Sequence, residues 1–242
     1  MNLQKHFIPM EGMTFKRLLR FFLPLFPHQK PYQLHQATKG EYIYSPNQNR
    51  THLYLLQKGR VKIGTQVDEC QQHLQHIVWE DELFGESVLL GQNPSNGFAQ
   101  ALEEVEYYTI EVEAIRQLFT QNWMVRLQIL GAINKRLQSA ESRLLAQQTQ
   151  DTRTRIVDFL LYIAKERGSR VGKYGYFVAP FFKQTDIAAL TGCSLPAVGL
   201  VLRKLKKEGL ISYNSRQLRV YNIHELKHWI NTHSPPQPPY PS

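Results

Sequence analysis

The segment from residue 184 to residue 210 restricts the fold more than any other part of this sequence, because it carries the start and stop signals of two short helices with a tight turn between them. Gly192 supplies the positive φ angle that a sharp turn after a helix requires. Ser194 follows as the N-cap of the next helix, and Pro196 is tolerated in that helix's first turn. Gly209 ends it. The spacing therefore predicts a helix-turn-helix in this segment.

A short hairpin is predicted directly after the second helix. Residues 210–213 and 216–221 read as strands on either side of a turn at Asn214 and Ser215. A helix-turn-helix places its second helix in the major groove of DNA, while basic side chains around it hold phosphates. The predicted DNA-contacting residues are Lys183, Gln184, Ser194, Leu195, Gly199, Leu200, Arg203, Lys204, Lys206, Lys207, Arg216 and Arg219.

The positive charge of the chain is confined to the same region. From Thr152 to the end there are 14 Lys or Arg against 5 Asp or Glu, whereas before Thr152 there are 15 of each, so this region holds the whole net charge of +9. Such asymmetry indicates one module that meets a polyanion and another that does not. The sequence has no Gly-rich phosphate loop, nucleophile elbow or metal-binding His pair, so nothing in it favours an enzyme.

The first half of the chain has the pattern of a β-rich domain. Between residues 32 and 112, short runs rich in Tyr, Val, Ile and Leu alternate with turn residues, which predicts a sandwich, roll or barrel. The apolar patch from Phe21 to Phe26 is too short to span a bilayer, so we expect it to end a helix that packs on this domain. The predicted strands are 41–44, 53–56, 60–64, 76–79 and 107–112.

A short helix over 114–119 and a long helix over 123–147 are predicted next. The apolar residues of the long helix recur at steps of three and four, which is the pattern of a heptad seam. One interpretation is a helix that lies on its own domain's core. The narrow apolar stripe on an otherwise polar helix favours pairing with a second copy, so a homodimer is predicted. The seam residues are Leu130, Ile133, Leu137, Ala140 and Leu144.

Polar segments separate the remaining parts. A hinge over 147–150 precedes an amphipathic helix over 152–166, and a basic loop is expected over 168–175. The only cysteines, Cys70 and Cys193, are too few for a disulfide framework or a Cys-rich metal site and fit a reduced, cytoplasmic setting. The predicted parts of the chain are a helix and β-domain over 1–113, helices over 114–150, the winged helix-turn-helix over 151–233, and a disordered Pro-rich tail over 234–242 for which a Pro-binding module is the alternative.

In these motifs and in their order, the sequence resembles the Crp/Fnr superfamily of bacterial transcription regulators. The resemblance is carried by Asp186 to Ile211, by Leu55 to Val61 and by Phe84-Gly85-Glu86. It implies an α+β fold with an N-terminal cyclic-nucleotide-binding-like β-roll, a long dimerisation helix and a C-terminal winged helix-turn-helix. It also implies a cytoplasmic homodimer on a two-fold symmetric DNA site, with RNA polymerase as a partner and no membrane. Residues 136–141 and 153–161 look most like the branch of cyanobacterial global nitrogen regulators.

The second helix departs from the superfamily's pattern. Its usual Ser-Arg-Glu-Thr-Val start is replaced by the run from Ser194 to Val198, and a later Arg is replaced by Leu200. Apolar side chains contact thymine methyl groups but cannot make the bidentate contact with guanine. Either a different site is read, with Arg203 carrying more of the contact, or phosphate contacts dominate. The rival interpretation is a member that does not bind DNA and docks a protein on its apolar surface of Leu195, Pro196 and Leu200.

The sequence leaves the identity of the effector open. Cyclic-nucleotide sensors of the superfamily follow a Gly-Glu pair with an Arg-Ser pair, but after Gly85-Glu86 this chain has no basic residue before Arg116. A buried phosphate without a cation is unfavourable, so cyclic-nucleotide binding is not expected. Two distant cysteines cannot hold an iron–sulfur cluster, and no cofactor or metal is predicted.

The nitrogen-regulator branch binds 2-oxoglutarate in the roll, and the resemblance implies a similar site here. The branch's Arg in the roll is missing, which would leave a dicarboxylate short of charge-assisted hydrogen bonds. The open alternatives are 2-oxoglutarate, another small ligand, or no ligand or a protein partner. A further interpretation is that Arg136 and Glu141 simply pair on a solvated face. The predicted effector-binding residues are Phe84, Gly85, Glu86, Ser87, Arg136 and Glu141.

Overall fold

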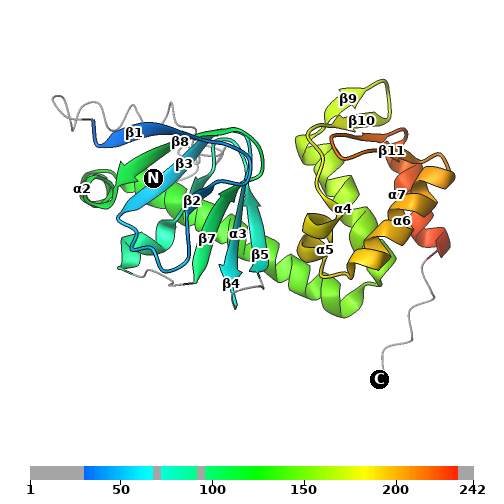
Figure 1. Cartoon of the computed structure of the whole chain (residues 1–242), viewed down its shortest axis with the longest axis horizontal. Helices are drawn as coiled ribbons and strands as arrows, with labels where there is room; N and C mark the ends of the chain where they lie inside the picture. The colour runs from blue at the N-terminus through cyan, green and yellow to red at the C-terminus, as the bar shows by residue number, and fades with distance from the viewer. Residues whose placement is uncertain (1–29, 68–71, 92–95, 234–242) are drawn as a thin grey trace, which may run out of the picture. The chain divides into compact units, whose positions relative to one another are not determined.

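The computed structural model of the chain describes residues 30–67, 72–91 and 96–233, and its contacts divide the chain into a unit over 1–139 and a unit over 140–242 (Figure 1). The predicted N-terminal helix, Cys70 and the Pro-rich tail lie outside the described residues. Each unit is described by itself.

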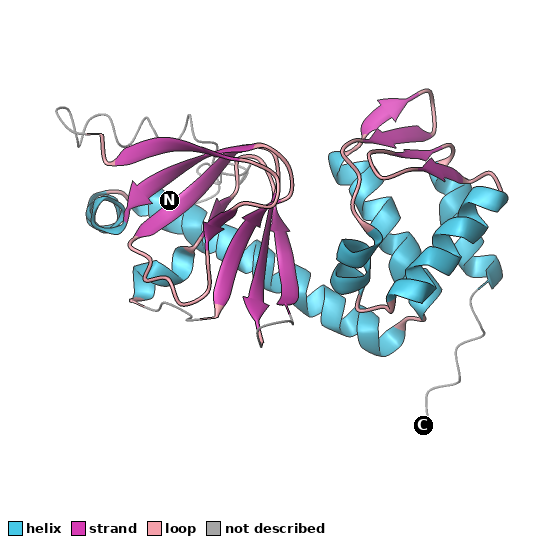
Figure 2. Ribbon diagram, viewed as in Figure 1, coloured by secondary structure: helices cyan, strands magenta, loops and turns pink. Residues whose placement is uncertain are grey.

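The N-terminal unit contains two antiparallel four-stranded sheets (Figure 2). Their strand orders are β1-β8-β3-β6 and β2-β7-β4-β5, so strands distant in sequence, such as β1 and β8, lie side by side. Along the chain the strands are β1 (Tyr32–Ala37), β2 (Tyr42–Tyr44), β3 (His52–Lys58), β4 (Val61–Gln66), β5 (Gln72–Val78), β6 (Leu83–Phe84), β7 (Gly97–Ala101) and β8 (Val105–Glu111).

Strand β3 separates the two cores of this unit. Because successive side chains of a strand point to opposite faces, Leu53 and Leu55 pack with α2 (Val112–Gln121) and the start of α3, whereas Tyr54 and Leu56 pack between the two sheets. This double burial explains why β3 reads as a continuous apolar run. A short 3-10 helix, η2 (Glu86–Leu90), follows β6.

The five predicted strands and the helices predicted over 114–119 and 123–147 are confirmed, with shifts of a few residues at their ends. The strands β1, β6 and β7 were not predicted one by one, since β1 is mostly polar and exposed, β6 has two residues and β7 begins with Gly. The long helix α3 (Trp123–Thr149) begins where Asn122 Oδ1 accepts a hydrogen bond from Met124 N at 3.0 Å.

The C-terminal unit is a helical core with one four-stranded sheet in the order β11-β12-β10-β9. Asp151 is the N-cap of α4 (Thr152–Arg167), and its Oδ1 accepts a hydrogen bond from Thr154 N at 2.8 Å. The elements are α4 (Thr152–Arg167), β9 (Ser169–Val171), β10 (Gly175–Val178), α5 (Gln184–Thr191), α6 (Leu195–Lys207), β11 (Ile211–Tyr213), β12 (Leu218–Val220) and α7 (Ile223–His233).

Two expectations need correction in this unit. The basic loop predicted over 168–175 is a β-hairpin, because Gly172 adopts a φ of +69° and lets β9 turn back on β10. The helix α7 was not predicted, although its buried residues Ile223, Leu226 and Trp229 recur at helical spacing. Within the described ranges, no single helix has the length and hydropathy needed to cross a membrane, and only the bent pair α5 and α6 passes that test when taken together.

Candidate functional site

The predicted helix-turn-helix is present in the C-terminal unit. Helices α5 and α6 meet at 109°, and Gly192 ends α5 with a φ of +63°. Ser194 caps α6 by accepting a hydrogen bond from Ala197 N at 3.4 Å. The buried residues Val198, Val201, Leu202 and Leu205 hold α6 on the core, so the opposite face of the helix is left at the surface.

A clamp that the sequence did not reveal fixes the turn. The guanidinium of Arg155, on α4, donates to the carbonyl oxygens of Thr191 at 3.0 Å, Gly192 at 3.3 Å and Gln150 at 2.9 Å. It therefore joins the end of α5 to the segment that follows α3. Charge-assisted hydrogen bonds of this kind are stronger than neutral ones, so the clamp sets the position of the turn firmly. An Arg on an amphipathic helix gives no sequence signal for such a role.

The exposed face of α6 carries apolar side chains as predicted. Leu195 is 46% exposed and Leu200 is 61% exposed. Gly199, which was predicted to contact DNA, is buried and so is not itself at the surface. A methyl group at Gly199 would lie 3.2 Å from Gln184 Oε1 and 3.8 Å from Arg203 Nη1, so these two side chains cover it.

Basic residues surround this face at the N-cap of α5, on α6 and on the wing, which is the hairpin of β11 and β12. Lys204 is the exception, since its Nζ lies 3.9 Å from Glu208 Oε1 and 5.3 Å from the Trp229 ring centroid, and Trp229 Nε1 donates to Glu208 at 2.6 Å. It thus helps pack α6 against α7. We call the following nine exposed residues the recognition surface: Lys183, Ser194, Leu195, Leu200, Arg203, Lys206, Lys207, Arg216 and Arg219.

The turn of the wing is held by local hydrogen bonds. Asn214 Oδ1 accepts from the backbone N of Arg216 at 2.8 Å and of Gln217 at 3.0 Å, which is the usual role of Asn in a tight turn. The carbonyl of Arg216 accepts from Phe181 N at 2.8 Å. The backbone of Arg216 is therefore fixed, while its side chain remains at the surface.

In the roll, the structure brings most of the predicted effector residues together. Phe84 is fully buried, and Gly85 turns the chain with a φ of +79° into η2. The guanidinium of Arg136, on α3, donates to the carboxylate of Glu86 and to the carbonyl of Leu83. The alternative that Arg136 simply pairs with Glu141 is therefore wrong. Glu141 is exposed and belongs to the C-terminal unit, and Ser87 is half-buried in η2.

A buried cation in the roll, Arg50, was not predicted from the sequence. The Arg50 guanidinium lies 4.5 Å from the ring centroid of Tyr44, whose ring in turn stacks with Phe84 and lies tilted against Tyr54. Burial raises the pKa of Tyr44 to about 12, although the charge of Arg50 opposes this shift. The interior of the roll thus holds a cation within a group of aromatic rings. Arg50 escaped prediction because it lies before β3, in a polar stretch, whereas the superfamily's motif has its Arg after the Gly-Glu pair.

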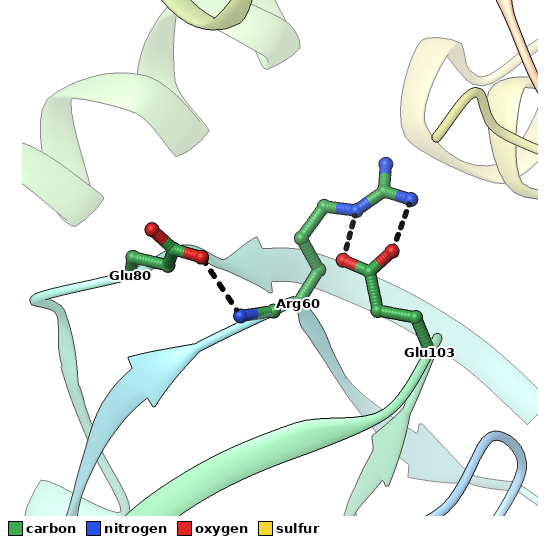
Figure 3. A network of polar contacts seen from close by, with 4 residues as sticks. Arg60, Glu80 and Glu103 are labelled. Carbon is green, nitrogen blue, oxygen red and sulfur yellow. Dashed lines mark hydrogen bonds and ion pairs between the residues drawn. The ribbon is translucent and has the colours of Figure 1, made fainter. Parts of the chain in front are cut away.

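A second buried Arg serves the strand connections. Arg60 makes two hydrogen bonds to the carboxylate of Glu103, at 2.9 and 3.2 Å, and Glu80 accepts from Gly59 N at 3.0 Å (Figure 3). The network ties together three connections between strands of the roll, after β3, β5 and β7. Arg60 is paired with Glu103, and Glu80 accepts from a backbone N–H, so we assign the network to the stability of the roll.

The apolar seam of α3 lies at the surface of the chain. Leu130, Leu137 and Leu144 are 60%, 55% and 60% exposed, Ile133 is 40% exposed, and Ala140 is half-buried. The core contacts of α3 are made instead by Val125 and Ile129 on another face. Trp123 is also exposed and lies seven residues before Leu130, in register with the seam, a position that was not predicted from the sequence. The seam position between them is occupied by Arg126, and the exposed Leu127 lies beside it, one residue out of register.

Within the described parts of the chain, no group of three or more His, Cys, Asp and Glu side chains could hold a metal ion.

Two family models match the chain. The model of the cyclic nucleotide-binding domain matches residues 34–122, and that of the Crp-like helix-turn-helix domain matches residues 154–229. The global nitrogen regulator of Synechococcus elongatus is 24% identical over 207 residues, which cover 85% of this chain and 93% of that protein. The CRP-like cAMP-activated global transcriptional regulator of Mycobacterium tuberculosis is 23% identical over 188 residues, with 78% and 84% covered.

A solved structure agrees in fold. FixK2 of Bradyrhizobium japonicum matches with a TM-score of 0.69 at 19% identity, over 81% of this chain and 96% of that one. These matches confirm the predicted order of a cyclic-nucleotide-binding-like roll, helices and a Crp-like helix-turn-helix.

Proposed function

Because this chain belongs to the Crp/Fnr superfamily of DNA-binding transcription regulators, we propose that it binds a two-fold symmetric DNA site as a homodimer and reads that site through α6. Members of this superfamily are regulators rather than enzymes. The working setting is the cytoplasm, where RNA polymerase is the partner that the family implies.

One observation carries the DNA-binding part of the proposal. The recognition surface combines the exposed face of a capped helix, whose opposite face is buried, with six exposed basic residues at the N-cap of α5, on α6 and on the wing. Phosphate contacts from basic side chains supply most of the affinity for DNA and make it depend on salt. Rigid elements hold these side chains where a duplex can meet several of them at once.

The homodimer rests on the seam of α3. Seven-residue repeats of apolar side chains on one helix face are buried when two such helices pair. In a symmetric dimer each chain offers the same face to the other, so one stripe is sufficient. The exposure of Leu130, Leu137 and Leu144 supports this use of the helix.

We place a small acidic effector, with 2-oxoglutarate as the first candidate, at Phe84, Gly85, Glu86, Ser87 and Arg136. The contact between Arg136 and Glu86 supports an anion-binding role, because Arg136 already holds a carboxylate there. An acidic ligand would have to displace Glu86 from Arg136. Glu141 joins this site only as an expectation from the family.

The test is binding of the purified protein to DNA selected from genomic fragments, measured at several salt concentrations. Alanine at Lys207 or at Arg216 should weaken binding to all sequences about equally. It should also lower the salt slope, which is the steepness with which the logarithm of the binding constant falls with the logarithm of the salt concentration, by about one for each phosphate-binding side chain removed. Alanine at Lys39, an exposed basic residue of the N-terminal unit, is the matched control and should change neither. A wild-type protein that is folded but binds no DNA would refute the proposal.

A second candidate function rests on the exposure of Leu195 and Leu200. Contiguous apolar side chains at a surface are typical of protein docking sites. If the protein has this function, the wild type binds DNA weakly or not at all, and Leu200→Ser abolishes binding of the protein partner. Retention of strong DNA binding by the wild type decides against it.

A further inference from the structure

Two polar side chains from different helices meet above the groove-facing part of α6. Gln184 is the first residue of α5, and Arg203 lies one turn beyond Gly199 on α6. Since a methyl at Gly199 would lie 3.2 Å from Gln184 Oε1 and 3.8 Å from Arg203 Nη1, both side chains reach over the same point of the helix backbone. The absence of a side chain at Gly199 is what allows this approach.

Both side chains keep their hydrogen-bonding capacity. Neither the side chain of Gln184 nor that of Arg203 makes a hydrogen bond or ion pair with another of the described residues. By contrast, Lys204 contacts Glu208 and Trp229, and the Ser194 hydroxyl oxygen accepts the capping hydrogen bond from Ala197 N. The guanidinium of Arg203 and the amide of Gln184 are thus available to a ligand at this surface.

The chemistry of these two groups suits the edges of bases. An Arg side chain makes a bidentate contact with O6 and N7 of guanine, and a Gln side chain makes one with N6 and N7 of adenine. The neighbouring Leu195 and Leu200 can only touch thymine methyl groups or other apolar atoms. The amide of Gln184 can hydrogen-bond a phosphate but adds no charge to such a contact, and the surrounding Lys and Arg residues already supply that charge.

We propose that Gln184 and Arg203 are the specificity-determining residues of this regulator, with Arg203 reading guanine and Gln184 reading adenine in each half-site. Gly199 is the positioning residue that lets the two side chains converge. This inference rests on the proposed DNA binding through α6. Of the two alternatives that the sequence leaves open, a different site read with Arg203 or a predominance of phosphate contacts, this inference follows the first.

The test is selection of bound sequences from a random DNA library by the full-length protein, followed by competition binding on the selected site at fixed salt. For Arg203→Lys, which keeps the charge but loses the planar fork, the preference for guanine at one position of each half-site should fall roughly 5- to 150-fold. Its salt slope should stay unchanged. Gln184→Ala should relax an adenine position by a similar factor, and Lys207→Ala is the control that lowers the salt slope without changing preference.

A third variant tests the convergence itself. Gly199→Ala should leave the melting temperature unchanged or raise it, because Ala favours a helix more than Gly does. Its methyl should nevertheless displace Gln184 and weaken the adenine preference. A folded variant with altered specificity is not expected from a merely structural glycine.

The outcomes separate the two levels of the proposal. If Arg203→Lys and Gln184→Ala select the same sequences as the wild type, the pair does not read bases, although the protein binds DNA. If Arg203→Ala weakens all sequences equally and lowers the salt slope, Arg203 is a phosphate contact and the inference is wrong. If the folded wild type binds no DNA, the proposed function fails and this inference with it.

Discussion

Leu144 and Leu145 are neighbours on α3 that differ in one respect, and this makes the proposed dimer testable. Both are 60% exposed in the single chain and both lie on the same helix. Only Leu144 continues the steps of three and four that define the seam. Replacing each with Ala in turn therefore compares the seam with an equally apolar position beside it.

The expected effect follows from the surface that each leucine still has to bury. Complete burial of a Leu side chain contributes about 1.5–3 kcal/mol. With 60% of its surface remaining, Leu144 offers roughly 1–2 kcal/mol per chain, and a symmetric dimer contains it twice. Since about 1.4 kcal/mol corresponds to a tenfold change, Leu144→Ala should weaken the dimer by about 30- to 700-fold. Leu145→Ala should change the dissociation constant little.

The measurement is a dilution series followed by sedimentation equilibrium or mass photometry. Circular dichroism serves as the check on folding, and neither variant should lose helix because Ala is the better helix former. Equal weakening by both substitutions, or a Leu144→Ala protein that remains as tightly dimeric as the wild type, would falsify the seam as the dimer contact.

Four further predictions concern the roll and the turn. Because the folded-state pKa of Tyr44 is raised from 10.0 to about 12, the stability that its neutral form contributes is complete below pH 10 and is lost as the pH rises to 12. The unfolding free energy should fall by about 1.4 kcal/mol per pH unit in that window, and denaturant titrations of Tyr44→Phe should lack this component. Arg155→Ala should lower the unfolding free energy by about 2–4 kcal/mol, since it removes the donor to three carbonyl oxygens, whereas alanine at the exposed Lys165 should stay within about 0.5 kcal/mol in the same titration. Cyclic AMP at millimolar concentration should leave the melting temperature unchanged, and a saturable rise would contradict the sequence argument against a cyclic nucleotide. Glu86→Gln removes the carboxylate that competes for Arg136, so 2-oxoglutarate should raise its melting temperature more than that of the wild type; no shift in either protein rules out this ligand.

Local signals in the sequence were sufficient for most of the fold. Gly192, Ser194 and Gly209 act within a turn or two of their own positions, so the helix-turn-helix could be predicted from them. The hairpin β9–β10 was not predicted because its strands are only three and four residues long, and β9 carries Ser and Arg, all of it exposed, without an apolar alternation. The aromatic and β-branched residues of β10 and the turn residue Gly172 are the local signals of this hairpin, but so short a run is also compatible with a loop.

The site was less predictable because its contacts join residues that are far apart in the chain. The partner of Arg136 is Glu86, 50 residues away, whereas helical spacing pointed to the nearer Glu141. Arg50 is buried against Tyr44 from a polar stretch with no strand pattern. Such pairings depend on which strands and helices the fold brings together, and local sequence patterns such as periodicity and turn residues do not reveal that arrangement.

The position of Arg136 connects the two halves of the proposed mechanism. Its guanidinium is held by Glu86 and the Leu83 carbonyl at the turn between β6 and η2, and the next residue on α3 is Leu137 of the seam. A ligand that takes the place of Glu86 must therefore alter the contacts of α3 within the turn that carries Leu137. A ligand shifts a conformational equilibrium only through interactions that differ between two states. In the proposed mechanism such a difference is available without a long relay, because Arg136, proposed to bind the ligand, and Leu137, proposed to contact the second copy, are adjacent in the same helix.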